Sequence, residues 1–455
     1  MLADRAMPGT ASSELVEFQL SKLNDRTAVI GIIGLGYIGL PLVNATALAG
    51  FHAVGFDIDP GKIVRLNAGQ SYITSVPSAA ITQYRRLGLF HATTDFSELA
   101  GCDVIVICVP TPLTKQREPD LSAIRNTAAS IYPFLKTGQL IVLESTTYPG
   151  TTREVMVPIL EKSGLANRCD FFAGFSPERE DPGNAKYATA DIPKVIAGDG
   201  ADASRLMAAF YGAIVRQVVP VSTPEVAEAV KITENIFRAV NIALVNELKT
   251  TYEAMGIDVW DVIEAAKTKP FGFMPFYPGP GLGGHCIPID PFYLTWKARE
   301  FGLTTRFIEL AGEVNVAMPK YVVDRLVEAL DRKLHVPAGG SRILVIGMAY
   351  KKNVGDMRES PSFKLISLLE KRNAHTDYHD PLVPEIGPTR EHMEYAGRKS
   401  VPLTAEAVAS YHAVLLATDH DSLDYGMIAA NARLIVDTRN AFAQRGLTGP
   451  NIVKA

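Results

Sequence analysis

Cysteine is scarce in this chain: four occur among 455 residues, and none forms a C-x-x-C pair. This scarcity argues against a disulfide scaffold and a zinc site, and it favours a reducing compartment such as the cytoplasm. No apolar run approaches the ~20 residues that a membrane helix needs, and the charged N-terminus lacks the apolar core of a secretory signal. Lys and Arg total 45 against 49 Asp and Glu. No basic surplus therefore points to nucleic acid or an anionic membrane.

The chain is instead rich in apolar residues, with 47% hydrophobic and 21% charged. This balance is typical of a globular protein with a substantial core, and the length favours about three domains. Strand-like runs alternate with helical stretches up to about residue 220, which predicts a parallel sheet covered by helices on both faces. The predicted strands in this part are 28–33, 53–56, 103–109 and 139–143.

The texture changes after residue 220. Ser222 and Glu225 form a predicted capping box around Pro224, at the start of a helix of some 30 residues that ends at Met255. A loop rich in proline, glycine and aromatic residues follows at 270–291, and then another helical stretch to about 334. A second α/β pattern begins at Arg342, with further strands near 411–417 and 433–437.

A glycine motif, Gly34-Leu35-Gly36-Tyr37-Ile38-Gly39, stands directly after the first strand and opens a helix. Its three glycines permit a tight turn, the approach of a pyrophosphate and close packing of helix on strand. Asp57 stands at the end of the second strand, near the position where dinucleotide-binding domains carry an acid that accepts hydrogen bonds from the ribose hydroxyls. An acid there favours NAD over NADP, because it would repel a 2′-phosphate. Lys62 either reaches the adenosine ribose or is solvated. The pattern predicts a Rossmann-like domain, although a glycine turn can also serve packing alone.

Two further features suggest chemistry. Cys286 lies in a glycine-proline loop just before a predicted helix start at Asp290, whose dipole would favour a thiolate. A buried structural cysteine is the alternative. Lys231 and Asn235 are four residues apart, so they share one face of the long helix and could stabilise an oxyanion. From the residues alone, an exposed, solvated lysine is the favoured interpretation, because such lysines are common on helices.

Seven motifs in order make residues 28–445 resemble the UDP-glucose/GDP-mannose dehydrogenase family. They are GIIGLGYIGLP, VPTP, ESTTYPGTT, FSPE, the K-x-x-x-N of 231–235, GPGLGGHCIPIDP and GMAYKKNVGDMRESP. The resemblance implies two Rossmann-like doubly wound domains joined by a helical central domain. The expected boundaries are 1–27 for a polar extension with a short helix capped at Ser12 or Ser13, 28–220 for the NAD-binding domain, 221–334 for the central dimerisation domain, and 335–455 for the UDP-sugar-binding domain.

The resemblance also implies an activity: oxidation of a sugar-nucleotide C6 alcohol to the carboxylate, with two NAD+ and one water. A cysteine traps the aldehyde as a thiohemiacetal, which a second oxidation converts to a thioester that water cleaves. Carried over by motif, Cys286 is the nucleophile, Lys231 and Asn235 hold the oxyanion and the attacking water, and Asp290 assists them. Thr146 and Glu178 position water and exchange protons.

The remaining expected contacts also follow from the resemblance. NAD is expected to contact the glycine turn and further residues of both α/β domains, namely Gly34, Gly36, Tyr37, Ile38, Gly39, Asp57, Lys62, Thr111, Thr146 and Arg358. The UDP-sugar is expected to contact Glu178, Lys231, Asn235, Tyr277, Gly279, Gly281, Gly283, Tyr350, Lys351 and Arg439. A structural ion pair is the alternative for Lys351 and Arg439. A homodimer or higher homo-oligomer is expected, and no metal is.

Two departures from the UDP-glucose branch favour an N-acetylated sugar. Ile289 stands where that branch has a lysine, and Pro182 stands where it has a second acid after Glu178. The loop and the 176–184 stretch look most like the branch that acts on UDP-N-acetylglucosamine. UDP-glucose, UDP-N-acetylmannosamine and UDP-N-acetylgalactosamine remain alternative substrates. A two-electron dehydrogenase and a catalytically silent nucleotide-sugar sensor are the other readings, and both leave Cys286 without a role.

Overall fold

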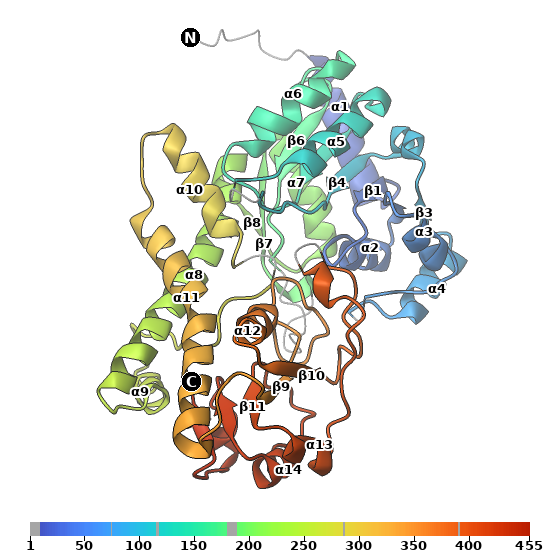
Figure 1. Cartoon of the computed structure of the whole chain (residues 1–455). Coiled ribbons are helices and arrows are strands. Elements are labelled where there is room, and N and C mark those ends of the chain that lie inside the picture. Colours follow the sequence, from blue (N-terminus) through green and yellow to red (C-terminus); the bar gives the residue numbers. More distant parts are fainter. Residues whose placement is uncertain (1–9, 74, 115–117, 180–188, 285–286, 390–391) are drawn as a thin grey trace. The chain divides into compact units, whose positions relative to one another are not determined.

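The computed structural model describes residues 10–73, 75–114, 118–179, 189–284, 287–389 and 392–455. The chain divides into two compact units (Figure 1). The first contains the residues up to 234 together with 292–303, and the second contains 235–291 and 304–455. The predicted helical middle segment is thus shared between the two units. Among the described residues, no helix is both long and apolar enough to cross a membrane.

The first unit is built on an eight-stranded sheet in the order β3-β2-β1-β4-β5-β6-β7-β8. Most neighbours are parallel, as predicted, but β7 runs antiparallel to β6. A parallel neighbour generally needs a crossover helix, and the described part of the β6–β7 connection contains only a short 3-10 turn. The strands are β1 (Val29–Ile33), β2 (His52–Phe56), β3 (Phe90–Thr93), β4 (Val104–Ile107), β5 (Leu140–Leu143), β6 (Phe172–Phe175), β7 (Lys194–Gly198) and β8 (Val218–Pro220).

Helices cover this sheet and complete its core. They are α1 (Thr10–Asn24), α2 (Gly39–Leu48), α3 (Pro60–Asn67), α4 (Ser78–Arg86), α5 (Ser122–Ile131), α6 (Val157–Leu160) and α7 (Ala201–Ile214). From residue 292 onward, α10 (Asp290–Glu300) also belongs to this unit.

The segment before the first strand is more than the polar extension with a short helix that the sequence predicts. Helix α1 is 15 residues long and begins before Ser12. Its Val16 and Leu23 are 0% and 1% exposed and join the core beneath the sheet. The Lys22 ammonium pairs with Asp103, which also accepts the backbone N–H of Val29. The sequence did not reveal this because only a few apolar side chains of α1 face the core, among many polar ones.

The second unit contains a five-stranded parallel sheet in the order β10-β9-β11-β12-β13. Side chains of β9 alternate between two separate cores: Ile343 and Val345 face one, and Leu344 and Ile346 face the other. This alternation confirms the predicted sheet with helices on both faces. The strands are β9 (Arg342–Ile346), β10 (His375–His379), β11 (Ala413–Leu416), β12 (Ile435–Asp437) and β13 (Ile452–Lys454); the helices are α9 (Val259–Ala266), α11 (Arg306–Ala329), α12 (Pro361–Glu370), α13 (Ala405–Ser410) and α14 (Tyr425–Asn431).

The predicted long helix is present as α8 (Pro224–Ala254), which begins in the first unit and ends in the second. The predicted capping box is wrong. Thr223, not Ser222, receives the backbone N–H of Val226, and Glu225 pairs with Arg153 instead of returning to the cap. Because Pro224 is the first helical residue, the residue directly before it takes the cap position.

Candidate active site

The glycine turn after β1 has three different environments for its three glycines. Gly34 has a φ of +93°, and a Cβ there would lie 2.6 Å from the carbonyl oxygen of Cys108. A Cβ on Gly39 would lie 2.0 Å from the Gly34 carbonyl oxygen, whereas a Cβ on Gly36 would meet nothing within 4 Å. The tight turn therefore requires glycine at position 34, and the close packing of helix on strand requires glycine at position 39. The second faces open space, where a pyrophosphate can approach the backbone. Tyr37, beside it, is 46% exposed.

Asp57 closes this turn from the end of β2. Its carboxylate accepts the backbone N–H groups of Leu35 (2.9 Å) and Asp59 (3.0 Å). Lys62 extends from α3 to within 2.9 Å of the same carboxylate. The Lys62 ammonium thus stands beside the predicted ribose acid while its side chain is 34% exposed, so its contact with the adenosine ribose stays a prediction. Asp57 itself is 5% exposed.

Three predicted residues follow the carboxyl ends of the neighbouring parallel strands β4, β5 and β6. The Thr111 hydroxyl donates to the carbonyl oxygen of Thr146 at 2.7 Å, so these two residues are in contact. The Tyr293 hydroxyl, fully buried, donates to the carbonyl oxygen of Thr111. Glu178 follows β6. In open α/β sheets, ligands bind at the carboxyl ends of the strands, and a pocket of the first unit is lined by Ile38 of the glycine turn and by Glu178.

Glu178 and Lys231 form a buried ion pair within the first unit. The Lys231 ammonium lies 3.0 Å from a Glu178 carboxylate oxygen and also donates to the Glu178 carbonyl oxygen. The residues are 8% and 6% exposed. The structure therefore brings together two residues that lie 53 positions apart and that the sequence assigned to one site. It also rules out the alternative of an exposed helix lysine.

The sequence analysis missed a third residue of this group, Glu228, which lies one helical turn before Lys231. Its carboxylate is fully buried and accepts the backbone N–H groups of Gly150 (2.5 Å) and Thr152 (2.8 Å) and the Thr152 hydroxyl (2.6 Å). Burial raises the pKa of Glu228 to about 7 against these hydrogen bonds. Glu228 thus fastens the start of α8 to the segment that follows Thr146. No local pattern could have shown this pairing, because 76 residues separate Glu228 from Thr152.

Asn235 and Asp290 form the corresponding contact in the second unit. The Asn235 amide donates to an Asp290 carboxylate oxygen at 2.6 Å, and the residues are 2% and 0% exposed. Asp290 is the first residue of α10, as predicted. The predicted nucleophile, Cys286, and its neighbour His285 lie outside the described residues. What the structure provides is a buried amide–carboxylate contact four residues beyond the cysteine.

The loop before Cys286 packs against the C-terminal α/β part of the second unit at its glycines. A Cβ on Gly279 would lie 2.5 Å from the Arg439 guanidinium, and a Cβ on Gly283 would lie 2.6 Å from the Cβ of Tyr350. Gly281, with a φ of +135°, is within 3.2 Å of two proline rings by the same measure. Predicted substrate residues from distant parts of the chain thus meet here: the loop glycines, Tyr350 and Arg439.

The other predicted contact residues of the second unit, Tyr277, Lys351 and Arg358, differ in how firmly the protein holds their side chains. The Tyr277 hydroxyl donates to Glu264 at 2.8 Å and its ring stacks on Trp260, so this side chain is held by α9. Lys351 is half-buried next to Tyr350. Arg358 makes a two-pronged contact with Asp356, and its backbone carbonyl receives the N–H of Gly284. It belongs to the second unit, and its predicted contact with NAD stays a prediction.

The geometry of the first unit alone is compatible with a bound dinucleotide. Gly36 leaves room at the N-terminus of α2, where backbone N–H groups and the helix dipole favour an anion, and Asp57 stands at the end of the next strand. A nicotinamide dinucleotide bound there would supply a hydride acceptor for a carbon next to oxygen. The ion pair between Glu178, which follows β6, and Lys231 of α8 places a buried carboxylate beside a buried ammonium. In enzymes, groups of these two kinds can exchange a proton and stabilise an oxyanion.

Comparison with known proteins agrees with this geometry. Three family models match in order: the NAD-binding domain of the UDP-glucose/GDP-mannose dehydrogenase family at 28–215, its central domain at 225–317 and its UDP-binding domain at 344–444. The chain is 37% identical to the UDP-N-acetyl-D-glucosamine 6-dehydrogenase of Pseudomonas aeruginosa, over 89% of this chain and 93% of that one. It is 33% identical to the UDP-N-acetyl-D-mannosamine dehydrogenase of Pyrococcus horikoshii, over 90% and 95%.

Solved structures agree at the level of the whole fold. The UDP-N-acetylmannosamine dehydrogenase structure from Pyrococcus horikoshii superimposes with a TM-score of 0.84 at 30% identity, covering 94% of this chain and 98% of that one. A UDP-glucose dehydrogenase from Pyrobaculum islandicum gives a TM-score of 0.80 at 27% identity, with the same coverage. With a dinucleotide turn, a buried lysine–glutamate pair and these three domains in order, the chain belongs to the UDP-glucose/GDP-mannose dehydrogenase family and is an NAD-dependent nucleotide-sugar dehydrogenase.

Proposed function

We propose that this protein oxidises the C6 hydroxyl of a UDP-N-acetylhexosamine, UDP-N-acetylglucosamine foremost, to the uronic acid in two steps. The balance is one alcohol, two NAD+ and one water giving one carboxylate, two NADH and three protons. The resulting UDP-sugar acid would serve the biosynthesis of surface polysaccharides. The observation that carries the proposal is the buried pairing of Lys231 with Glu178, because it supplies a fixed cation and carboxylate at the carboxyl ends of the strands that build the NAD domain.

The proposed roles follow from the chemistry of each side chain. Cys286 attacks the first aldehyde and forms a thiohemiacetal; its later oxidation leaves a thioester, which water hydrolyses to release the thiol. The Lys231 ammonium stabilises the oxyanion that forms at C6 in each addition. Glu178 is placed to exchange protons with substrate or water, and Thr146 to orient that water. Asn235, held by Asp290, presents its amide in a fixed direction.

The substrate assignment rests on the relatives as well as the sequence. Relatives at 32–37% identity are named for UDP-N-acetylglucosamine, UDP-N-acetylmannosamine and N-acetylgalactosaminuronic acid, each with an N-acetyl group. Ile289 is 7% exposed beside Asp290 and replaces a charged group of the glucose branch. A pocket that merely accommodates an acetyl methyl discriminates by ~1–3 kcal/mol. We therefore expect UDP-glucose to be a poor substrate and not an excluded one.

The test is a comparison of kcat/KM across UDP-N-acetylglucosamine, its manno and galacto epimers and UDP-glucose at saturating NAD+. The NADH formed per sugar is read at completion. Two NADH per sugar and the highest kcat/KM for UDP-N-acetylglucosamine are expected. A higher value for UDP-glucose would overturn the substrate assignment. One NADH per sugar would overturn the four-electron mechanism, and binding without turnover would favour the sensor.

We also propose that the working form is at least a homodimer joined through the helical part of the second unit. Phe237 and Leu244 are about half exposed and lie seven residues apart on one face of α8; Phe307 and Leu310 of α11 are exposed as well. Leu244→Glu is expected to shift the mass by light scattering toward the monomer, whereas Leu48→Glu, at an exposed leucine of α2, is not. A wild-type monomer with full activity at micromolar concentration would refute the dimer.

A cytoplasmic location completes the proposal. Cys102 and Cys169 are free thiols, and a nucleophilic Cys286 has to remain reduced to act. Both conditions are met in a reducing compartment. NAD and a nucleotide sugar are also expected there as the two small-molecule partners.

A further inference from the structure

The two sheets repeat one local arrangement at the ends of corresponding strands. After β1, Gly34 has a φ of +93° and donates its N–H to the carbonyl oxygen of the last residue of β2 at 2.8 Å. After β9, Gly347 has a φ of +95° and makes the same contact with the last residue of β10, also at 2.8 Å. An aspartate follows both second strands. Asp57 accepts the N–H of the residue after the first glycine, and Asp380 accepts the equivalent N–H of Met348 at 2.7 Å.

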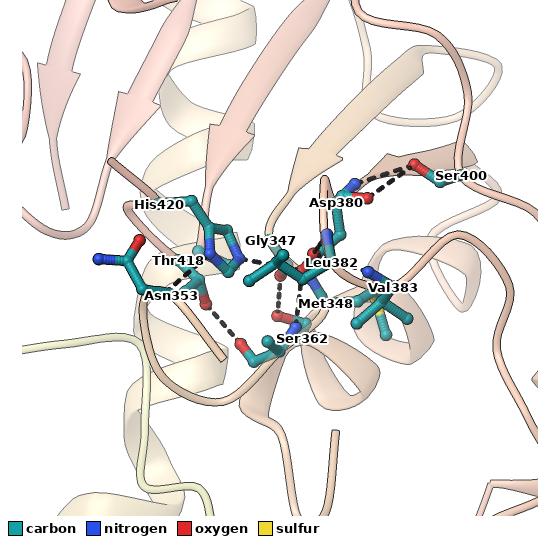
Figure 2. Close-up of polar contacts among 12 residues, drawn as sticks. Gly347, Met348, Asn353, Ser362, Asp380, Leu382, Val383, Ser400, Thr418 and His420 are labelled. Carbon is teal, nitrogen blue, oxygen red and sulfur yellow. Dashed lines mark hydrogen bonds and ion pairs between the residues drawn. The ribbon is translucent and has the colours of Figure 1, made fainter. Parts of the chain in front are cut away.

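The two aspartates differ in what surrounds them. Asp57 meets the partly exposed ammonium of Lys62. The side chain of Asp380 is 0% exposed. One of its carboxylate oxygens accepts from Met348 and Ala349, and the other accepts from Leu382 and Val383. Figure 2 labels Asp380 with Met348, Leu382 and Val383. Burial alone would raise the pKa of Asp380, but hydrogen bonds from His420 and these backbone groups hold it below its ordinary value. The Asp380 carboxylate therefore binds backbone amides inside the protein and is not accessible to a ribose.

His420 provides the fifth contact of Asp380 and links it to a second loop. Its Nε2 lies 3.1 Å from the Asp380 carboxylate, and its Nδ1 accepts the backbone N–H of Asn353 at 3.0 Å (Figure 2). Because Nδ1 is an acceptor, Nε2 carries the proton that faces the carboxylate. The ring is fully buried. It comes from the segment after β11, so it spans the point between β9 and β11 where the strand order reverses.

These contacts hold both ends of the five-residue stretch 349–353, which carries Tyr350 and Lys351. At one end, the Ala349 N–H donates to Asp380 and the Ala349 carbonyl oxygen receives the Thr418 hydroxyl at 2.6 Å. At the other end, Asn353 has a φ of +61°, a conformation that needs support from its surroundings, and receives it through His420. Tyr350, between them, packs against Gly283.

We propose that Asp380 and His420 are positioning residues that fix the shape of the 347–353 loop and thereby set the affinity for the uridine diphosphate part of the substrate. The inference rests on the proposed role of Tyr350 and Lys351 in holding the UDP-sugar. It adds to that role the two buried residues through which the loop is held. Neither residue is among the proposed catalytic residues, and the contacts of both are with groups of the protein itself.

The variant that tests this is His420→Ala, with His412→Ala as its matched control. The His412 Nδ1 also accepts a backbone N–H of the same sheet, that of Arg342 at 2.9 Å, but at the opposite end of β9 and β11. We expect His420→Ala to raise the Kd for UDP and the KM for UDP-N-acetylglucosamine by about tenfold, with kcat and the KM for NAD+ within about threefold of wild type. His412→Ala should leave all four values near wild type.

A conservative variant and an exchange measurement separate positioning from loss of structure. His420→Asn keeps an acceptor near the Nδ1 position and should recover most of the UDP affinity. Hydrogen–deuterium exchange of wild-type protein should show protected amides across 347–353, and exchange of this loop should accelerate in His420→Ala but not in His412→Ala. Unprotected amides in the wild-type loop would overturn the proposal even if every variant failed to fold.

The readouts also distinguish this inference from the proposed function. Wild-type protein that binds UDP but oxidises no UDP-sugar would end the proposed function, while the effect of His420→Ala on the Kd for UDP would still decide the inference. Wild-type protein with full turnover, and a His420→Ala variant with unchanged Kd and KM values, would overturn the inference alone. An equal fall in affinity for UDP and NAD+ would also overturn it, because it would indicate a general loss of folding.

Discussion

The Lys231 ammonium and the Glu178 carboxylate lie 3.0 Å apart, each in a residue less than one-tenth exposed. Breaking a buried ion pair from one side leaves a charge without its counter-ion, which typically costs about 3–5 kcal/mol. Lys231→Met should therefore lower both thermal stability and kcat, the latter by at least about a hundredfold. The double variant Lys231→Met/Glu178→Gln should recover stability without recovering turnover. Recovery of both would assign the pair to folding alone.

Cys286→Ser is expected to abolish turnover while leaving NAD and UDP-sugar binding within a few fold. A hydroxyl has a far higher pKa than a thiol, so almost no nucleophile would exist at neutral pH. The control is Cys169→Ser, which removes an exposed free thiol of the first unit and should have no effect on turnover. Steady-state NADH formation and calorimetric binding measure the two quantities. A fully active Cys286→Ser protein would remove the covalent mechanism.

The wild-type protein should prefer NAD over NADP by at least roughly tenfold, because the Asp57 carboxylate favours ribose hydroxyls and repels a 2′-phosphate. Asp57→Ala should narrow that preference, as judged by the ratio of kcat/KM values. Asp59→Ala is the matched control, since its carboxylate caps α3 through Gly61 and is not part of the turn. Equal use of both cofactors by the wild type would contradict the assignment of Asp57.

Glu228 predicts a pH dependence of stability. Burial raises its pKa to about 7 in the folded protein, above its ordinary value, so the folded state holds this proton more tightly than the unfolded state. The resulting stabilisation is complete below the unfolded pKa and is lost as the pH rises through 7, by roughly 2–3 kcal/mol between pH 5 and 8. In calorimetry at several pH values, the unfolding midpoint of the wild type should fall relative to that of Glu228→Gln as the pH rises.

The control for this pH dependence is Glu247→Gln, at an exposed glutamate of the same helix. Its midpoint should differ from wild type by a constant amount over the same range. A pH-independent difference between wild type and Glu228→Gln would show that Glu228 does not titrate in this window.

The sequence predicts the elements of this fold better than their junctions. Both sheets and α8 were foreseeable, because the alternation of apolar runs, the glycine turn and the long helical stretch that begins at Pro224 are local patterns. The antiparallel direction of β7 was not, because it depends on the path of the chain between β6 and β7, which no local pattern encodes. The cap residue Thr223 could have been identified from the sequence, because Pro224 at the first helical position places the cap directly before it.

The candidate site divides in the same way. Motif resemblance brought Lys231, Asn235 and Asp290 into one site, and the structure pairs each of them with a predicted partner. Glu228 was missed because two of its three donors are backbone groups, which almost any residue at 150 and 152 would supply, and the third is the hydroxyl of Thr152, 76 positions away. Asp380 did leave a signal: Tyr378-His379-Asp380 ends a strand just as Gly55-Phe56-Asp57 does. Its burial under His420 depends on a residue 40 positions away.

Helix α1 has a practical consequence for anyone shortening this chain. The apolar pattern alone would suggest starting at Ala28, where the first strand was expected. Truncation there would delete Val16 and Leu23 from the core and leave Asp103, 7% exposed, without the Lys22 ammonium. The deletion would uncover apolar surface on the first unit, and the shortened protein is expected to aggregate during purification, whereas a start at residue 10 retains the whole helix.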